Sequence, residues 1–278
     1  MNKDHVGERC HAPIDFSVSA AEIARWLAAA GVEPPSPSKD DGAVPPMLLA
    51  ASCLRGTSTA LLHEALQANF MRLSLHELDL RFNDGVEPGD ALQLSTTLVD
   101  VSARGLHELA LLRSEVRSVS GDIIATCDAG VLCLSPRPRS EPAVPPAWLS
   151  VNDPEDQELA FDERETVVVE PTRGREFADA IADPNPLYRD GAAAQIAGLP
   201  DVIVPALYPV TRLHDALQQR RSGAARVARL AVRLVTPVLP GDELRLGFSP
   251  AEGDRLRVAV QNQRGEPVLA CGLAELRR

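Results

Sequence analysis

Two stretches of the chain share the same alternation of apolar and polar residues. Leu78, Leu80 and Phe82 alternate with charged or polar neighbours, as in a strand with one buried face. The whole segment Leu78–Leu94 matches the segment Leu230–Leu246, which lies 152 residues further along. A Pro-Gly-Asp trio interrupts both segments at the same place and predicts a turn in which glycine takes a positive φ.

Three further matches occur in the same order in both halves of the chain. Their offsets range from 144 to 160 residues, so one copy carries insertions relative to the other. Collinear matches of this kind indicate that a half-chain has been duplicated. The matched segments are Val44–Met47 with Val204–Leu207, Leu62–Leu66 with Leu213–Leu217, Val116–Cys127 with Val260–Cys271, and the turns Pro88-Gly89-Asp90 with Pro240-Gly241-Asp242.

Helical patterns come before the strands in each half. A capping box formed by Ser19 and Glu22, and a stop signal at Gly31, predict a short first helix. A long helix is expected to follow, from Pro46 to about Ala68, because proline suits the first helical turn. In the second half the long helix follows Pro205, with apolar residues at helical spacing.

The strands that follow each long helix predict an α+β fold. Leu109–Val119 and Ile123–Leu134 form a hairpin around Ser120-Gly121-Asp122, and the second half repeats this pattern around Arg264-Gly265-Glu266. Two antiparallel sheets are therefore expected, each wrapped around a long central helix. The two copies can pair their edge strands into one continuous sheet, which removes an exposed edge.

The stretch between the two copies has a different composition, which indicates a linker. Residues 135–165 contain many prolines and an acidic run, which is typical of an extended connection. The expected organisation is a first domain over residues 15–134, the linker, and a second domain over residues 166–278. Residues 1–14 are expected to be loosely attached.

The overall charge and the cysteines exclude several functions. A net charge of -11 disfavours general nucleic-acid binding, which needs a basic surface. The five cysteines are odd in number and form no Cys-x-x-Cys pair, so neither a disulfide framework nor a zinc site is suggested. We find no signal region after Met1 and no long apolar run, so we expect a cytoplasmic protein that does not bind membranes.

One basic stretch interrupts this acidic background. No Asp or Glu occurs from Ala216 to Gly241, and several arginines do, among them Arg226 and Arg229. Arginine binds phosphate well, so these two residues are candidates for contacts with the phosphate groups of a ligand. The alternative is an ordinary solvated rim.

The segment most informative about chemistry is Phe177–Pro209. Each proline of Asp183-Pro184-Asn185-Pro186 pushes the preceding residue out of the helical region, so Asp183 and Asn185 lie on a turn. A short helix, Asp190–Ala197, closed by Gly198, is expected next. A carboxylate, an amide and the Tyr188 phenol are thereby placed where they can enter one pocket.

This segment resembles the MaoC-like hydratase/dehydratase family. The resemblance rests on Phe177-Ala178, Asp183-Pro184-Asn185-Pro186-Leu187, Asp190, Ala194, Gly198 and Val202–Val204. It implies a double hot-dog fold that acts on CoA or acyl-carrier thioesters, often as a homodimer, without a metal or other cofactor.

Two departures from the family pattern matter. Tyr188 occupies the position of the family's catalytic histidine, and Pro205-Ala206 replaces a histidine–glycine pair at the start of the long helix. Both resemble the family's substrate-binding modules that lack activity. The first copy lacks the motif altogether.

The candidate site residues follow from this resemblance. Asp183 is the candidate general acid or base and Tyr188 its partner, while Asn185, Ala206, Leu207 and Tyr208 are candidates for substrate binding, with the N–H of Ala206 polarising the thioester carbonyl. Each has a structural alternative: Asp183 and Asn185 brace the turn, and the two tyrosines pack in the core. His63 and His214, at matched positions, are weaker candidates for the missing histidine.

Three functions therefore stay open. The first is hydration or dehydration of a 2-enoyl or 3-hydroxyacyl thioester. The second is a module that binds an acyl thioester, or supports a catalytic partner, without chemistry of its own. The third is another thioester reaction, such as hydrolysis or a biosynthetic tailoring step, because one fold hosts many chemistries.

Overall fold

The computed structural model of the protein describes residues 1–32, 43–68, 72–83, 85–134, 161, 163–220 and 226–277. The first half contains β1 (Ile14–Phe16), α1 (Ala20–Ala30), α2 (Pro46–Leu61), the 3-10 turn η1 (Glu64–Leu66), β2 (Leu73–Phe82), β3 (Leu92–Arg104), β4 (His107–Ser118) and β5 (Ile123–Cys133). The second half contains β6 (Glu163–Val168), α3 (Arg173–Ala180), η5 (Pro186–Tyr188), α4 (Gly191–Ile196), α5 (Leu207–Gln219), β7 (Arg226–Leu234), β8 (Glu243–Pro250), β9 (Arg255–Gln261) and β10 (Pro267–Arg277).

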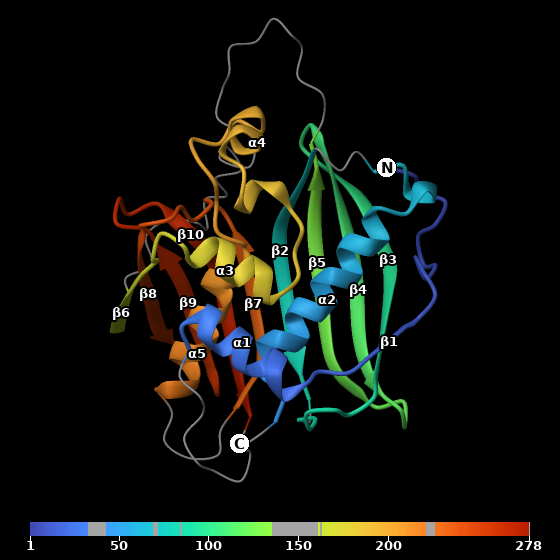
Figure 1. Ribbon diagram of the computed structural model, residues 1–278, viewed down its shortest axis with the longest axis horizontal. Helices are drawn as coiled ribbons and strands as arrows, with labels where there is room; N and C mark the ends of the chain where they lie inside the picture. Colours follow the sequence, from blue (N-terminus) through green and yellow to red (C-terminus); the bar gives the residue numbers. More distant parts are fainter. Residues whose placement is uncertain are drawn as a thin grey trace, which may run out of the picture.

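All these strands form one antiparallel sheet, against which the long helices α2 and α5 pack (Figure 1). The strand order is β1-β3-β4-β5-β2-β7-β10-β9-β8-β6, so the second half mirrors the first about the β2–β7 pair. At this junction Asp79 pairs with Ala231, its own counterpart 152 residues along the chain. A pseudo-two-fold axis therefore passes through the junction, and the expected pairing of the two copies is confirmed.

The duplication is visible in individual backbone hydrogen bonds. The N–H of Val44 donates to Val86, and the N–H of Val204 donates to Val238, at 2.8 and 2.9 Å. In the two Pro-Gly-Asp turns the glycine N–H also makes equivalent bonds: Gly89 to Val18 and Gly241 to Val169. Both glycines have a positive φ, 91° and 89°, as the turn pattern predicts.

An ion-pair network crosses the junction on the face of β2 that points away from the helices. Arg229 donates two hydrogen bonds of 2.8 Å to the carboxylate of Asp79, and a third of 3.2 Å to Glu275. Arg81 also contacts Asp79, at 2.7 Å. Leu78 and Leu80 alternate with these residues and are buried on the helix side. The arginine-rich strand β7 thus helps to join the two halves.

The helices of the two halves are joined as well. Figure 1 shows α1 and α3 side by side, and the two are in contact. Arg173 donates to the carbonyl oxygen of Ala28 at 2.8 Å, and Arg212 donates to the carbonyl of Gly31. Cations at a helix C-terminus satisfy its free carbonyl groups, so the second half stabilises the end of α1.

Two expectations about the first half are wrong. Residues 1–14 are not loose, because the N–H groups of Gly7 and Cys10 donate to Leu98 and Thr96 at the edge of β3. That edge offers unpaired backbone groups, and the N-terminal segment satisfies them. The long helix ends at Leu61, not near Ala68. After Leu61 the apolar stripe stops, and the chain turns into η1.

The domain boundaries stay predictions. β6 begins at Glu163, inside the interval assigned to the linker, whereas residues 135–160 and 162 lie outside the described residues. Among the helices of the described residues, none is long and apolar enough to cross a membrane.

A close approach between α2 and the sheet makes Gly56 sensitive to substitution. A Cβ atom at Gly56 would lie 2.6 Å from Thr96 Oγ1 and 3.0 Å from Leu94 Cδ2. We expect Gly56→Ala to lower the free energy of unfolding by about 1–2 kcal/mol, because overpacking outweighs the gain in helix propensity. Denaturant unfolding measures this change. Gly85→Ala is the control, since its Cβ would meet nothing closer than 3.7 Å; equal stability of the two variants would contradict the prediction.

Candidate functional site

The turn that follows α3 holds the predicted carboxylate in a fixed place. Ala182 has a positive φ of 53°, and the N–H of Asp183 donates to the carbonyl of Ala178 at 2.9 Å. This is the Schellman arrangement that ends a helix. The Asp183 carboxylate then accepts the backbone N–H of Asn185 at 3.0 Å. Asp183 therefore braces the turn, which is the structural role that the sequence leaves open.

Asn185 links this turn to Tyr188. Its side-chain oxygen accepts the N–H of Leu187 at 3.1 Å and caps the 3-10 turn η5. The Tyr188 side chain lies close enough to Asn185 and Asp183 for both to influence the pKa of its phenol. A joint role of these three residues in a site stays a prediction.

The environment keeps the Tyr188 phenol protonated. Two effects raise the pKa of Tyr188 above its ordinary value. The larger is burial of the hydroxyl, and the smaller is the nearby negative charge of Asp183. Both effects disfavour the phenolate. Tyr188 is consequently a hydrogen-bond donor, and it cannot take the role of a base that a neutral histidine has.

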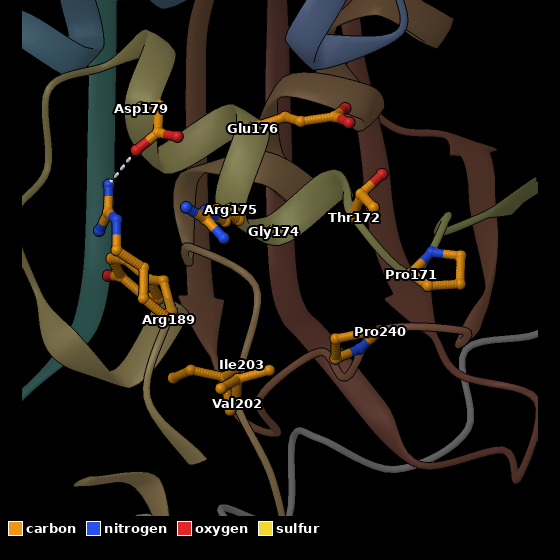
Figure 2. Close-up of a pocket in the computed structure, with 11 residues that line it drawn as sticks. Pro171, Thr172, Gly174, Arg175, Glu176, Asp179, Arg189, Val202, Ile203 and Pro240 are labelled. Atoms are coloured by element: carbon orange, nitrogen blue, oxygen red, sulfur yellow. Dashed lines mark hydrogen bonds and ion pairs between the residues drawn. The ribbon is translucent and has the colours of Figure 1, made fainter.

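Arg189 fixes the same turn from outside. One of its nitrogens donates to the backbone carbonyl of Asp183 at 2.7 Å, and another contacts the carboxylate of Asp179 on α3 at 2.6 Å (Figure 2). Asp190 holds the following segment by capping α4 through the N–H groups of Ala192 and Ala193. The motif is therefore held in place by hydrogen bonds on both sides.

A cleft of about 370 Å³ opens beside Tyr188. It lies between α3, the η5 turn and the segment that leads into α5 (Figure 2). Tyr188 and Arg189 line one side, and Val202 and Ile203 line another. Asp183 and Asn185 do not line it, so Tyr188 is the member of the motif that reaches the cleft.

The start of α5 carries two free backbone donors. Ala206 is its N-cap, and within the described residues the N–H groups of Ala206 and Leu207 make no hydrogen bond, as at most helix starts. Leu207 and Tyr208 are buried, and the Tyr208 ring packs edge-on against Phe177 at 5.4 Å. A role of these three residues in substrate binding stays a prediction.

The remaining candidates lie away from the cleft. Arg229 belongs to the junction network described above, and Arg226 lies on the same strand next to Gly85. His63 begins the 3-10 turn after α2, whereas His214 lies inside α5. Counted from the start of each helix, His214 corresponds to Cys53, so the match between the two histidines is not structural.

His214 is a buried neutral imidazole. It is 6% exposed and packs edge-on against Phe82, and burial lowers its pKa to about 4. In the unfolded chain the imidazole binds a proton below about pH 6.5. Between about pH 6.5 and about pH 4 the unfolded state binds more protons than the folded state, so the free energy of unfolding falls as the pH falls.

This burial predicts a pH-dependent stability. The free energy of unfolding of the wild type, measured with denaturant, should be lower at pH 4.5 than at pH 7.5. His214 should contribute about 2–3 kcal/mol of this difference. The His214→Leu variant should lose less over the same interval. An equal loss in both proteins would show that His214 does not titrate in this way.

Arg175 and Arg189 are the cleft residues that the sequence patterns do not single out. Arg175 lies before the motif segment and Arg189 directly follows Tyr188, and only the fold brings the two to one cleft. No cluster of residues with metal-binding geometry occurs within the described ranges.

Comparison with known proteins finds a family model that matches this segment. Residues 153–266 match the family model described as "MaoC like domain". A "UPF0336 protein" of Thermobifida fusca is 67% identical over 36 residues, which cover 13% of this chain and 24% of the relative. A second, of Saccharopolyspora erythraea, is 38% identical over 90 residues, covering 31% and 53%. The chain thus spans about a quarter and about half of these relatives.

Solved structures extend the likeness to the whole chain. A MaoC-like dehydratase from Phytophthora capsici superimposes with a TM-score of 0.79 at 15% identity, over 100% of this chain and 98% of that one. A Mycobacterium tuberculosis protein described as having a double hot-dog fold gives a TM-score of 0.61 at 15% identity, over 95% and 93%. At such identities the likeness concerns the fold.

Proposed function

The chain carries a MaoC-like domain within a double hot-dog fold, and from this premise we propose that it hydrates a 2-enoyl thioester, or dehydrates a 3-hydroxyacyl thioester, at the Asp183–Tyr188 turn. The observation that carries the proposal is that Tyr188 lines the cleft and lies close enough to Asp183 for the carboxylate charge to raise the pKa of its phenol. One group accepts a proton and the other donates one, which is what this reaction requires.

In the dehydration direction, the Asp183 carboxylate takes the proton next to the thioester carbonyl. The electrons of that C–H bond form the new double bond, and the hydroxyl at the next carbon leaves as water with the Tyr188 proton. Asp183 then returns its proton to the nearby Tyr188 oxygen. The substrate loses one water, and both side chains regain their starting states.

In the proposed reaction, the free N–H groups at the start of α5 stabilise the thioester carbonyl. Negative charge develops on the thioester oxygen as the proton leaves. Backbone donors at a helix N-terminus stabilise such charge. Ala206 and Leu207 supply two donors, and Pro205 and Pro209 supply none.

A second candidate is a module that binds the acyl thioester without reacting. Two observations favour it: Asp183 and Asn185 do not line the cleft, and Asp183 already braces the turn. In that case the chain holds an acyl chain or supports a catalytic partner.

Turnover of simple substrates separates the two candidates. Purified protein is incubated with crotonyl-CoA and with longer 2-enoyl thioesters, and loss of the enoyl absorbance is followed together with release of free thiol. The proposal expects loss of the enoyl group without thiol release. No turnover, combined with measurable binding, would favour the binding module, and release of thiol would indicate thioester hydrolysis.

A further inference from the structure

Two arginines from the second half of the chain contact the end of α1, which belongs to the first half. Arg173, the first residue of α3, donates to the carbonyl oxygens of Ala28 and Ala29 at 2.8 and 3.2 Å. Arg212, on α5, donates to the carbonyl oxygens of the next two residues. Carbonyl groups at a helix C-terminus lack partners further along the helix, so these two guanidinium groups supply donors to four of them.

Gly31 lets both guanidinium groups lie close to this helix end. It has a positive φ of 63°, and a Cβ atom there would lie 3.2 Å from Arg212 Nη1 and 3.9 Å from Arg173 Cζ. The Nε of Arg212 is buried without a hydrogen bond, and within the described ranges Arg212 has no carboxylate partner. The negative end of the α1 dipole is therefore the main partner of this cation.

The arrangement occurs in only one direction, although the chain is duplicated. α1 and α2 carry one arginine each, Arg25 and Arg55, and in the part of the chain that the structure describes neither makes a hydrogen bond or ion pair with α3 or α5. The arginines that contact α1 belong to the copy that contains the Tyr188 turn. A contact that only joined the halves could come from either copy, so its place in this copy points to the site.

α3 and α5 each contribute one part of the proposed site. α3 leads into the turn with Asp183 and Tyr188, whereas the start of α5 carries the free backbone N–H groups. The two helices also touch through the Phe177 and Tyr208 rings, which pack edge-on at 5.4 Å. Apolar packing has little directionality, whereas hydrogen bonds from both helices to one helix end define their relative placement. α1 is therefore a common support for the two parts.

We propose that Arg173 and Arg212 are positioning residues that use the end of α1 to place the turn that carries Tyr188 against the start of α5. The inference rests on the proposed function, since it names what holds the two parts of that site together. Neither arginine lines the cleft beside Tyr188, so each acts through the helix to which it belongs. The first copy, which lacks the motif, thereby takes part in the reaction.

Steady-state kinetics of Arg173→Gln and Arg212→Gln with crotonyl-CoA test the proposal. We expect kcat to fall about 10- to 100-fold in each, because a misplacement of about 1 Å costs up to about 100-fold. KM should change by less than about 2-fold, since no contact with the substrate is removed. Substitution of either arginine by Lys should restore part of the lost kcat, because the cation can still donate to the same carbonyls.

The matched control is Arg25→Gln. Arg25 is exposed and lies on α1 itself, and within the described residues its side chain makes no hydrogen bond. This variant should keep the wild-type kcat and KM. The double variant of Arg173 and Arg212 should lose little more than the weaker single variant, because both arginines act through the same helix end. Losses that multiply would overturn the common role of α1.

Hydrogen exchange followed by mass spectrometry gives a readout that needs no turnover. The N–H of Asp183 donates to Ala178, and the N–H of Asn185 donates to the Asp183 carboxylate, so both exchange slowly while the turn is closed. In both Gln variants, exchange over residues 178–188 should be about 10-fold faster, while exchange in β3, β4 and β5 stays as in the wild type. The Lys variants serve for the same measurements if a Gln variant does not fold.

The outcomes distinguish this inference from the proposed function. Turnover by the wild type, with kcat and exchange of the turn unchanged in both Gln variants, overturns the positioning role and leaves the reaction in place. Faster exchange confined to the turn, in a protein that does not turn over enoyl thioesters, supports the placement of the turn by α1 and overturns the reaction. Exchange that is faster across the whole sheet would show ordinary loss of stability and overturns the inference.

Discussion

Asp183→Asn should reduce hydration of 2-enoyl thioesters by about 100- to 10,000-fold, the usual contribution of one general acid–base group. The amide of asparagine can neither take the proton from the substrate carbon in dehydration nor give it back in hydration. Its side-chain oxygen can still accept the N–H of Asn185, so the turn should keep its shape. Initial rates with crotonyl-CoA measure the effect.

The matched control for this prediction is Asp201→Asn. Asp201 is exposed, its carboxylate accepts the N–H of Val202, and it lies outside the turn that carries Asp183 and Tyr188. It should retain the wild-type rate. Equal rates in Asp183→Asn and the wild type would remove Asp183 from the mechanism.

Tyr188→His should raise the hydration rate about 100-fold, the low end of what a well-placed general base contributes. A neutral imidazole can take a proton from water, whereas the Tyr188 phenol, whose pKa is raised by burial and by Asp183, only donates one. Tyr188→Phe, which keeps the ring but lacks the donor, should lose activity relative to the wild type.

The pH profile separates this effect from a general change in the site. The pKa of Tyr188 lies above its ordinary value of about 10, so this group should cause no change in the wild-type rate between pH 6 and pH 9. In Tyr188→His the rate should rise as the pH rises through about 6.5, where imidazole loses its proton. A histidine variant with the wild-type rate and a flat profile would show that position 188 does not exchange protons with the substrate.

Much of the architecture is predictable because it depends on local patterns. The alternation around Leu80 and the glycines of the Pro-Gly-Asp turns each determine the conformation of their own segment. Their recurrence after 152 residues reveals the duplication. The capping box at Ser19 and the short helix after Asp190 form where the sequence predicts them, since each supplies its own hydrogen-bonding partners.

What sequence patterns miss are pairings between distant residues. Arg229 is a plausible phosphate ligand until the fold places it against Asp79, 150 positions away. The N-terminal segment has no periodicity, yet it pairs with the edge of β3 because that edge is open. The five-residue similarity around His63 and His214 does not reflect equivalent places in the fold, because His63 follows α2 whereas His214 lies inside α5.

The central claim is that an acyl thioester lies with its carbonyl beside the Asp183–Tyr188 pair. A crystal structure of the protein with an unreactive analogue of a 2-enoyl thioester tests this most directly. The account predicts the carbonyl oxygen near the free N–H groups of Ala206 and Leu207, and the reacting carbons within reach of Asp183 and Tyr188. An analogue bound elsewhere, with the cleft beside Tyr188 empty, would contradict it.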